Sequence, residues 1–248
     1  MPAPSVKLLW RRDGHTVLPD AVAIVVDVLR ASSTITTALA RGATEIAVTR
    51  EVDHARRLAS AGRHLLVGER HNQKIEGFDY SNSPADLDTL DLTGRRIAFT
   101  STNFPHALRA CTSARCTLVG AVVNVTAAAT LAAELAEPHA ADICIMLAGE
   151  PVQPHAFEDY YFAGLAAAVL APRCRLDPTA EAAAAEAANL SPPQVIARSA
   201  HARELVDLDQ HRDVEFALMP DRFNIVGRRV QRDPSRLRDL IVTHTSPQ

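Results

Sequence analysis

Short, unbroken apolar runs alternate with Ala- and Leu-rich helical segments along most of the chain. Strands that are buried on both faces read as continuous apolar runs, and the helices between them cover the two faces of a sheet. The alternation therefore predicts an α/β fold with three layers, α/β/α, and a mostly parallel or mixed sheet. The predicted strands are Ala21–Val28, Glu45–Val48, Leu65–Val67, Arg96–Thr100, Cys116–Val119 and Asp142–Leu147.

Helical spacing of apolar residues marks the segments between these strands. Gly42 and Gly62 follow two of them, where a glycine can end a helix in the left-handed conformation. In the C-terminal part, Val195–Leu208 has helical spacing, whereas Val214–Leu218 alternates as a strand does. The other predicted helices are Ser33–Arg41, Val52–Ala61, Pro105–Ala110, Val125–Glu137 and Glu158–Leu170.

The clearest change in composition is an Ala- and Pro-rich segment at residues 172–193. A solvated Ala-rich helix between connections accounts for this segment, and nothing in it indicates chemistry. We expect a main α/β region at residues 1–171 and a C-terminal region at 194–248 that packs on it. One continuous domain is the alternative.

Charge and hydropathy argue against two classes of partner. The net charge is −3 and no block of Lys and Arg occurs, whereas nucleic-acid binding needs a concentrated basic surface. The longest apolar stretch, Phe162–Ala171, is about half of the ~20 residues that a bilayer requires. We expect a cytoplasmic protein that acts on a small phosphorylated substrate and has no nucleic-acid or membrane partner. A homo-oligomer is possible.

The segment Asp27–Ile35, with the sequence DVLRASSTI, follows an apolar strand and leads into a helix. Asp27 would lie at the carboxyl end of its strand, where open α/β sheets bind ligands. Ser32, Ser33 and Thr34 are helix-start residues, and the first turn of a helix offers unpaired N–H groups to an anion. An acid, the cation Arg30 and three hydroxyls at one turn indicate a place where a phosphate ester and a metal could meet.

Further polar clusters follow the other predicted strands and should lie at the same edge of the sheet. They are Glu69 and Arg70, the loop with Asp79, Asn82 and Ser83, the pair Thr102 and Asn103, and the helix start Glu158 and Asp159. Their oxygen donors, with no cluster of His or Cys, suit Mg²⁺ better than zinc. Phosphoryl transfer needs such a cation, arginines and N–H groups to position the phosphate and neutralise its charge.

The motifs, taken in order, resemble the ComB family, the 2-phosphosulfolactate phosphatases of coenzyme M biosynthesis. The resemblance spans about residues 20 to 170. It implies an α/β fold peculiar to that family, Mg²⁺ dependence and hydrolysis of a phosphate monoester on a small acid that carries a second anionic group. The segments that carry it are Asp27–Ile35, Gly42-Ala43, Gly68–Arg70, Lys74–Asp79, Asn82–Pro84, Ser101–Asn103, Asn124, Ala148-Gly149, Glu158-Asp159 and Ala163-Gly164.

On this hypothesis the catalytic residues are Asp27, Asp79 and Asp159, and direct attack by a carboxylate and activation of water both stay open. The predicted metal ligands are a subset of Asp27, Glu69, Glu158 and Asp159, with Asp79 as a further candidate. The predicted substrate-binding residues are Arg30, Ser32, Ser33, Thr34, Arg70, Asn82, Ser83, Thr102, Asn103 and Phe104.

The chain departs from the family's pattern at two places that bear on substrate choice. Thr102-Asn103 continues as Phe104-Pro105 where the family typically has Gly-Thr, so we expect Phe104 to border the non-phosphate half of the substrate. Glu69-Arg70 leads into His71-Asn72 in place of a Gly-rich turn. A paralogue that dephosphorylates a sugar or nucleoside phosphate would fit these substitutions.

A non-enzymatic anion-binding protein is the other alternative, since it would need the arginines and the helix start but not the acids. A haloacid-dehalogenase-type phosphatase is disfavoured because its second Asp is replaced by Leu29. No Gly-x-Ser-x-Gly, Walker-type or Gly-x-Gly-x-x-Gly segment occurs, which disfavours triad hydrolases, NTPases and dinucleotide enzymes.

Overall fold

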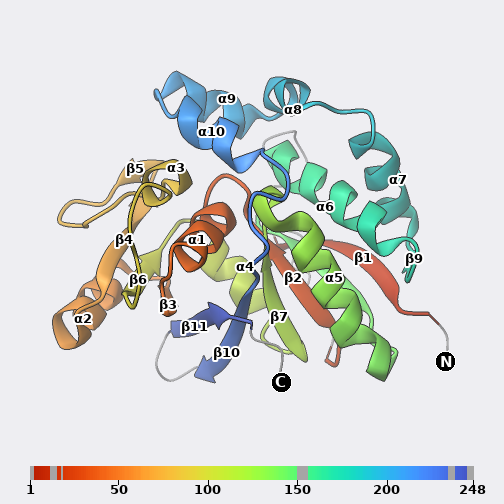
Figure 1. Cartoon of the computed structure of the whole chain (residues 1–248), viewed down its shortest axis with the longest axis horizontal. Coiled ribbons are helices and arrows are strands. Elements are labelled where there is room, and N and C mark those ends of the chain that lie inside the picture. Colours follow the sequence, from red (N-terminus) through yellow and green to blue (C-terminus); the bar gives the residue numbers. More distant parts are fainter. Residues whose placement is uncertain (1–2, 12–15, 18, 150–155, 234–237, 245–248) are drawn as a thin grey trace.

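The computed structural model describes residues 3–11, 16–17, 19–149, 156–233 and 238–244. In this part of the chain, a large mixed sheet is covered by helices, which confirms the α/β class (Figure 1). The strand order is β5-β4-β6-β3-β11-β10-β7-β2-β8-β1-β9. The strands are β1 (Ser5–Trp10), β2 (Val22–Val26), β3 (Glu45–Thr49), β4 (Leu65–Arg70), β5 (Gln73–Lys74), β6 (Arg96–Thr100), β7 (Cys116–Gly120), β8 (Ile143–Leu147), β9 (Arg175–Leu176), β10 (Gly227–Asp233) and β11 (Arg238–Thr243).

Two groups of parallel strands make up most of the sheet. Strands β9, β1, β8, β2 and β7 pair in parallel, as do β3, β6 and β4. The C-terminal hairpin β10–β11 lies between the groups and pairs antiparallel with β7 on one side and β3 on the other. The six strands predicted from sequence are present. The strands β1, β5 and β9 and the hairpin β10–β11 were not predicted, and the Arg-rich β10 does not read as a strand.

The helices follow the predicted order with shifted ends. The longer ones are α1 (Ala31–Ala40), α2 (Val52–Gly62), α5 (Val125–Ala136), α6 (Phe157–Leu170) and α7 (Pro178–Ala187). The shorter ones are α3 (Pro84–Leu87), α4 (Phe104–Ala110), α8 (Pro192–Arg198), α9 (Ala200–Asp207) and α10 (His211–Ala217). No helix among the described residues has both the length and the apolar character needed to cross a bilayer.

Two expectations for the C-terminal part are wrong. The predicted helix Val195–Leu208 is divided into α8 and α9 at Ser199, whose extended backbone lets its side chain cap α9 by accepting from Ala202 N. The predicted strand Val214–Leu218 belongs to α10 and the residue after it. Its alternation is coincidental, because Val214, Ala217 and Leu218 also share one helical face and are all fully buried.

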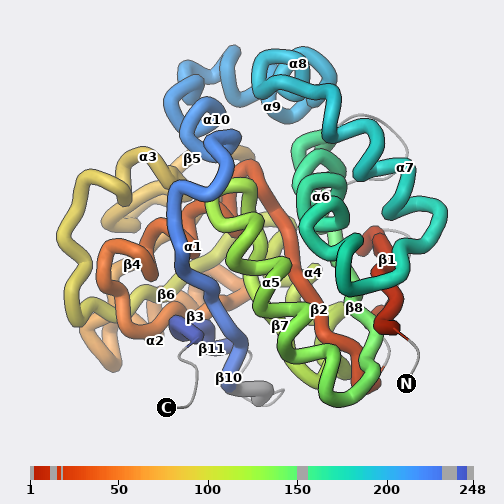
Figure 2. Tube along the Cα trace, turned by 45° about the vertical axis from the view of Figure 1, so that its right-hand side comes forward, coloured from red at the N-terminus to blue at the C-terminus, as the bar shows by residue number. Residues whose placement is uncertain are grey.

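Helices α8, α9 and α10 form an arm that runs across one end of the molecule, from α6 and α7 to α3 (Figures 1 and 2). The chain after the arm passes along the start of α5, where Asp221 N and Phe223 N donate to Val122 O and Val123 O, and then enters the sheet as β10. The predicted division into residues 1–171, 172–193 and 194–248 stays a prediction.

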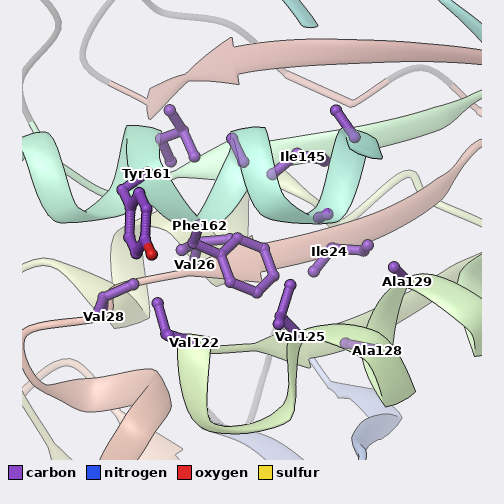
Figure 3. Close-up of a cluster of buried hydrophobic side chains, with 14 of the residues drawn as sticks. Ile24, Val26, Val28, Val122, Val125, Ala128, Ala129, Ile145, Tyr161 and Phe162 are labelled. Carbon is purple, nitrogen blue, oxygen red and sulfur yellow. The ribbon is translucent and has the colours of Figure 1, made fainter. Parts of the chain in front are cut away.

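A tightly packed core lies directly below the end of β2. Phe162 of α6 packs among Ile24 and Val26 of β2 and Val125 of α5 (Figure 3). Gly120, at the end of β7, makes this packing possible, since an added Cβ would lie 2.5 Å from both Ile24 Cγ2 and Phe162 Cζ. The strand end that carries Asp27 therefore rests on a rigid base, which suits a residue that must be positioned accurately.

Candidate active site

A pocket of about 240 Å³ lies where the ends of β2, β4 and β6 meet the arm. Six of the predicted site residues line it: Asp27, Arg30, Glu69, Asn82, Thr102 and Asn103. Residues that sequence reasoning did not select complete the lining: Leu29, His71, Asn72, His201 and Glu204. The expectation that loops after several strands share one site is thus met for six of its members.

Asp27 is buried at the turn from β2 to α1. Its Oδ1 accepts from Ala31 N at 3.3 Å, and its own backbone is held by the hydroxyl of Ser32. Burial raises the pKa of Asp27 to about 6, the charge of His201 lowers it in part, and the carboxylates of Glu69 and Glu158 raise it further. A carboxylate with such a pKa is ionised at neutral pH yet poorly solvated, which favours a bound cation or a proton acceptor role.

Two hydroxyls of the helix start, those of Ser32 and Ser33, bond to the backbone and not to the pocket. Ser32 Oγ donates to Asp27 O at 2.8 Å, and Ser33 Oγ donates to Val28 O at 2.7 Å. Thr34 is fully buried as well, and the amides of Ser32 and Thr34 already donate to Asp27 O and Arg30 O. The structure therefore does not place these three predicted phosphate-binding hydroxyls in the pocket. Those of Ser32 and Ser33 fix the turn that carries Asp27, whereas Thr34 Oγ1 has no hydrogen-bond partner among the described residues.

Glu69 ties two pocket loops together. Its Oε1 accepts from Thr102 N at 2.7 Å and its Oε2 accepts from Asn72 N at 3.1 Å. His71 and Asn72 form the two-residue turn between β4 and β5, with φ of 52° and 62°. Asn tolerates this left-handed backbone better than most residues, and it occupies a turn where a glycine would be unstrained.

Glu158 and Asp159 occupy the first turn of α6, behind the pocket. Asp159 Oδ1 accepts from Val28 N at 2.8 Å and Oδ2 from Gly149 N at 3.1 Å, so it joins the ends of β2 and β8. Burial, with the charges of Glu158 and Asp27, raises the pKa of Asp159 well above its usual value. Glu158 accepts from Ser199 Oγ at 2.5 Å and pairs with His201 Nδ1 at 3.2 Å, so both its oxygens are engaged within the protein.

Arg30 is buried and paired with a carboxylate that the sequence did not suggest. Its Nη1 lies 2.8 Å from Asp213 Oδ2 of α10, and its Nη2 donates to Asn72 O at 3.1 Å. Asp213 Oδ1 also accepts from Ser83 Oγ at 2.6 Å and from Ala85 N. Ser83, a predicted substrate-binding residue, therefore binds Asp213 and caps α3.

Arg70 and Asp79 do not reach the pocket. Arg70 donates to the carbonyl oxygens of Glu69 and Arg50 and to Thr100 Oγ1, so its guanidinium stabilises strand ends. Asp79 is exposed, and its Oδ2 accepts from Leu66 N near the start of β4. Neither residue lies among those that line the pocket, so their predicted substrate-binding and catalytic roles find no support in this geometry.

Phe104 is also placed differently from expectation. It is the first residue of α4 and is 0% exposed, packed in the core below the pocket. A fully buried ring cannot border a substrate, so the predicted wall of the binding site is wrong. The helical start at Phe104 is compatible with Pro105 because the second position of a helix needs no N–H donor.

We expect Phe104→Leu to lower the free energy of unfolding by about 1 kcal/mol, because the smaller side chain leaves part of the core unfilled. Substrate ranking should stay unchanged, since the ring lies outside the pocket. Urea unfolding and specificity constants for two phosphate esters measure the two effects. A changed ratio of specificity constants with unchanged stability would contradict this placement.

Asn82 is the predicted residue whose placement most directly indicates a ligand. It is 3% exposed, lines the pocket, and its Oδ1 has no hydrogen-bond partner among the residues that the structure describes. A buried polar atom without a partner costs free energy, so a donor or a cation bound in the pocket would satisfy it.

The oxygen donors of the pocket fit Mg²⁺ chemically. Asp27 and Glu69 supply hard carboxylate ligands in a confined acidic site, and Mg²⁺ needs only one or two carboxylates because it keeps several waters. In the described ranges, no three side chains among His, Cys, Asp and Glu form a ready-made metal cage. This arrangement suits a substrate-assisted magnesium site better than a zinc site.

Apart from Leu29 in the β2–α1 turn, the residues that were not predicted from sequence come from the arm or from the β4–β5 turn. His201 and Glu204 are three residues apart on α9, and Asp213 follows on α10. The spacing of His201 and Glu204 puts them on one face of a helix, which was the available signal. This spacing alone does not indicate that the helix face packs against the end of β2.

Comparison with known proteins gives a consistent result. The family model described as 2-phosphosulpholactate phosphatase matches residues 11–232. A probable 2-phosphosulfolactate phosphatase of Carboxydothermus hydrogenoformans is 34% identical over 213 residues, 84% of this chain and 85% of the relative. Proteins of the same name from Caldanaerobacter subterraneus and Thermotoga petrophila are 34% and 31% identical, over 83% and 82% of this chain and 86% and 87% of their own lengths.

Proposed function

The chain belongs to the 2-phosphosulfolactate phosphatase family, and on this basis we propose that it is a phosphoric monoester hydrolase that acts on 2-phosphosulfolactate or a closely similar small acid. The reaction adds water across the P–O ester bond and yields the free hydroxy acid and inorganic phosphate. The observation that carries the proposal is the confined pocket in which Asp27 and Glu69, both buried, face Asn82 and Thr102. Its volume suits a small acid rather than a large nucleotide.

Asp27 is the residue to which we assign the central role. It follows β2, which rests on the rigid core shown in Figure 3. Its carboxylate is therefore held in place beside the position of an attacking water or of the phosphorus atom. It either accepts a proton from the water that attacks phosphorus, or attacks phosphorus itself as the ester oxygen leaves with a proton, after which water hydrolyses the acyl phosphate to inorganic phosphate and the free carboxylate. Asp159 holds Val28 N and Gly149 N, and we assign it to the positioning of this strand end.

We propose that Asp27 and Glu69 hold Mg²⁺. The ion, when bound, would neutralise phosphoryl charge and polarise the P–O bond. The acidic lining supports this assignment, since Asp27, Glu69 and Glu204 would otherwise repel a phosphate. A cytoplasmic location and a homo-oligomeric state stay predictions.

Release of inorganic phosphate from a panel of esters tests the function. The panel contains 2-phosphosulfolactate, a sugar phosphate, a nucleoside monophosphate and an aryl phosphate, each with Mg²⁺ and with a chelator. The highest specificity constant for 2-phosphosulfolactate supports the proposal. A higher value for the sugar or nucleoside ester would identify a diverged paralogue, and no release from any ester would leave an anion-binding protein.

Binding of Mg²⁺ should be measurable without turnover. Mg²⁺ at about 100 times its dissociation constant stabilises the folded state by about 2.7 kcal/mol, which raises Tm by about 5 to 10 °C for a chain of this size. Glu69→Gln should reduce this shift strongly, while Asp79→Asn, which changes an exposed carboxylate outside the pocket, should keep it. Equal shifts in both variants would remove Glu69 from the metal site.

A further inference from the structure

The arm brings one imidazole to the pocket. His201 of α9 lines the pocket with Asp27 and Glu69, although it lies about 130 residues further along the chain than Glu69. Its side chain is 16% exposed, so it is largely desolvated but open on the pocket side. The motifs that carry the family resemblance end at Gly164, so they assign no role to this residue.

The hydrogen bonds around His201 settle which of its nitrogens carry protons. Asn72 Nδ2 donates to Glu204 Oε1 at 3.0 Å, and because a carboxylate only accepts, this bond fixes the orientation of the amide. Asn72 Oδ1 therefore faces His201 Nε2, at 3.3 Å, as an acceptor. On the other side of the ring, the carboxylate of Glu158 faces Nδ1 at 3.2 Å, also as an acceptor.

Two acceptors on the two ring nitrogens require both nitrogens to donate, and only the imidazolium ion does so. Burial by itself would lower the pKa of His201, but the hydrogen bond and charge of Glu158, with Asp27 and Glu204, raise it above the usual value. The geometry and the surrounding charges agree. Nε2 therefore carries a hydrogen on the side of Asn72 and the pocket.

Such a donor suits the charged groups of the pocket. Three carboxylates line it, from Asp27, Glu69 and Glu204, and no lysine is among its described lining residues. The guanidinium of Arg30 is already paired with Asp213 at 2.8 Å and with Asn72 O. Mg²⁺ on Asp27 and Glu69 would neutralise one anionic group of a phosphorylated acid, and a hydrogen-bond donor such as His201 Nε2 would bind a further one.

We propose that His201, whose ring is held by Glu158 and Asn72, donates a hydrogen bond from Nε2 to an anionic group of the substrate in the pocket. The inference rests on the proposed function and extends it, because it assigns substrate binding to the C-terminal arm. A phosphoryl or carboxylate oxygen would replace Asn72 Oδ1 on Nε2, where the present bond is long. Asn72 then acts as the positioning residue that presents the ring before the substrate arrives.

The test measures binding of inorganic phosphate by calorimetry in the presence of Mg²⁺, with kcat and KM for the best ester as a second readout. His201→Gln should weaken phosphate binding and raise KM by about tenfold, the loss expected for a hydrogen bond to a charged group. His201→Lys, which restores the charge, should recover most of the affinity. His211→Gln is the matched control, because His211 is an exposed histidine on the same arm outside the pocket.

Glu204→Gln provides a test of opposite sign. Glu204 is exposed, so its replacement should not disturb folding, and the Gln Oε1 can still accept from Asn72 Nδ2. Loss of the negative charge should then tighten phosphate binding by about two- to fivefold. Unchanged phosphate affinity in a folded His201→Gln protein, or an equal loss in His211→Gln, would overturn the proposal. Phosphate binding without ester hydrolysis in the parent protein would instead refute the proposed function and leave the binding assignment intact.

Discussion

Asp27→Asn should lower kcat/KM by about a hundredfold or more and at the same time make the metal-free protein more stable at pH 8. The loss of activity is expected because the amide can neither accept a proton nor bind a cation as a carboxylate does. The gain in stability is expected because the amide can still accept from Ala31 N but carries no charge that burial penalises. Opposite changes in activity and stability are typical of a functional residue.

The stability effect depends on pH, and its sign follows from the pKa of Asp27. Burial raises that pKa from 3.8 to about 6 in the folded protein, so the folded state holds the proton more tightly than the unfolded state. The contribution of the protonated group is complete below pH 3.8 and is lost as the pH rises through 6. At 1.36 kcal/mol per pKa unit, the ionised carboxyl costs up to about 3 kcal/mol above pH 6.

Urea unfolding of both proteins between pH 5 and pH 8, in a chelator, measures this effect. The variant should gain stability over the parent as the pH rises, and the gain should level off above pH 7. Asp79→Asn is the control, since the carboxylate of Asp79 is exposed and lies outside the pocket. A stability difference that is independent of pH, or near-normal turnover in Asp27→Asn, would show that Asp27 does not hold the role assigned to it.

The local pattern of the sequence was enough to predict the α/β class and the six apolar strands, because a strand buried on both faces has a recognisable composition. The hairpin β10–β11 could not be predicted in the same way. Its sequence, with Arg228, Arg229 and Arg232, is polar, and its place in the sheet depends on pairing with β7 and β3, which are distant in sequence. Tertiary pairing overrode local propensity here.

The candidate site was predicted where strand ends carry oxygen donors, as with Asp27, Glu69 and Thr102. The prediction failed where the direction of a side chain decides whether it lines the pocket. Ser32 and Ser33 bond to the carbonyls of their own turn, and Phe104 turns into the core, although their positions in the sequence suggested the pocket. His201 and Asp213 required knowledge of how the arm packs, which no local pattern contains.

Asp213→Ala should have the largest effect on stability, a loss of about 3 to 5 kcal/mol in the free energy of unfolding. Arg30 and Asp213 are both buried, with side chains 3% and 6% exposed, and their charged atoms are 2.8 Å apart. Removal of one partner leaves the other as an unpaired buried charge, which costs far more than the pair itself contributes. Ser83 Oγ and Ala85 N also lose their acceptor, so α3 loses its link to the arm.

The same substitution should reduce turnover, because Arg30 lines the pocket and its guanidinium also holds Asn72 O. Asp209→Ala is the matched control: its carboxylate on the arm is 97% exposed and pairs with exposed His211 at 3.5 Å, so its loss should cost less than about 1 kcal/mol. The double variant Arg30→Met with Asp213→Leu should regain much of the lost stability, since no charge is left unpaired. Its turnover should stay low, because the pocket then lacks the cation that orients Asn72. Similar stability losses in Asp213→Ala and Asp209→Ala, or full activity of the double variant, would show that the arm is not fastened to the site through this pair.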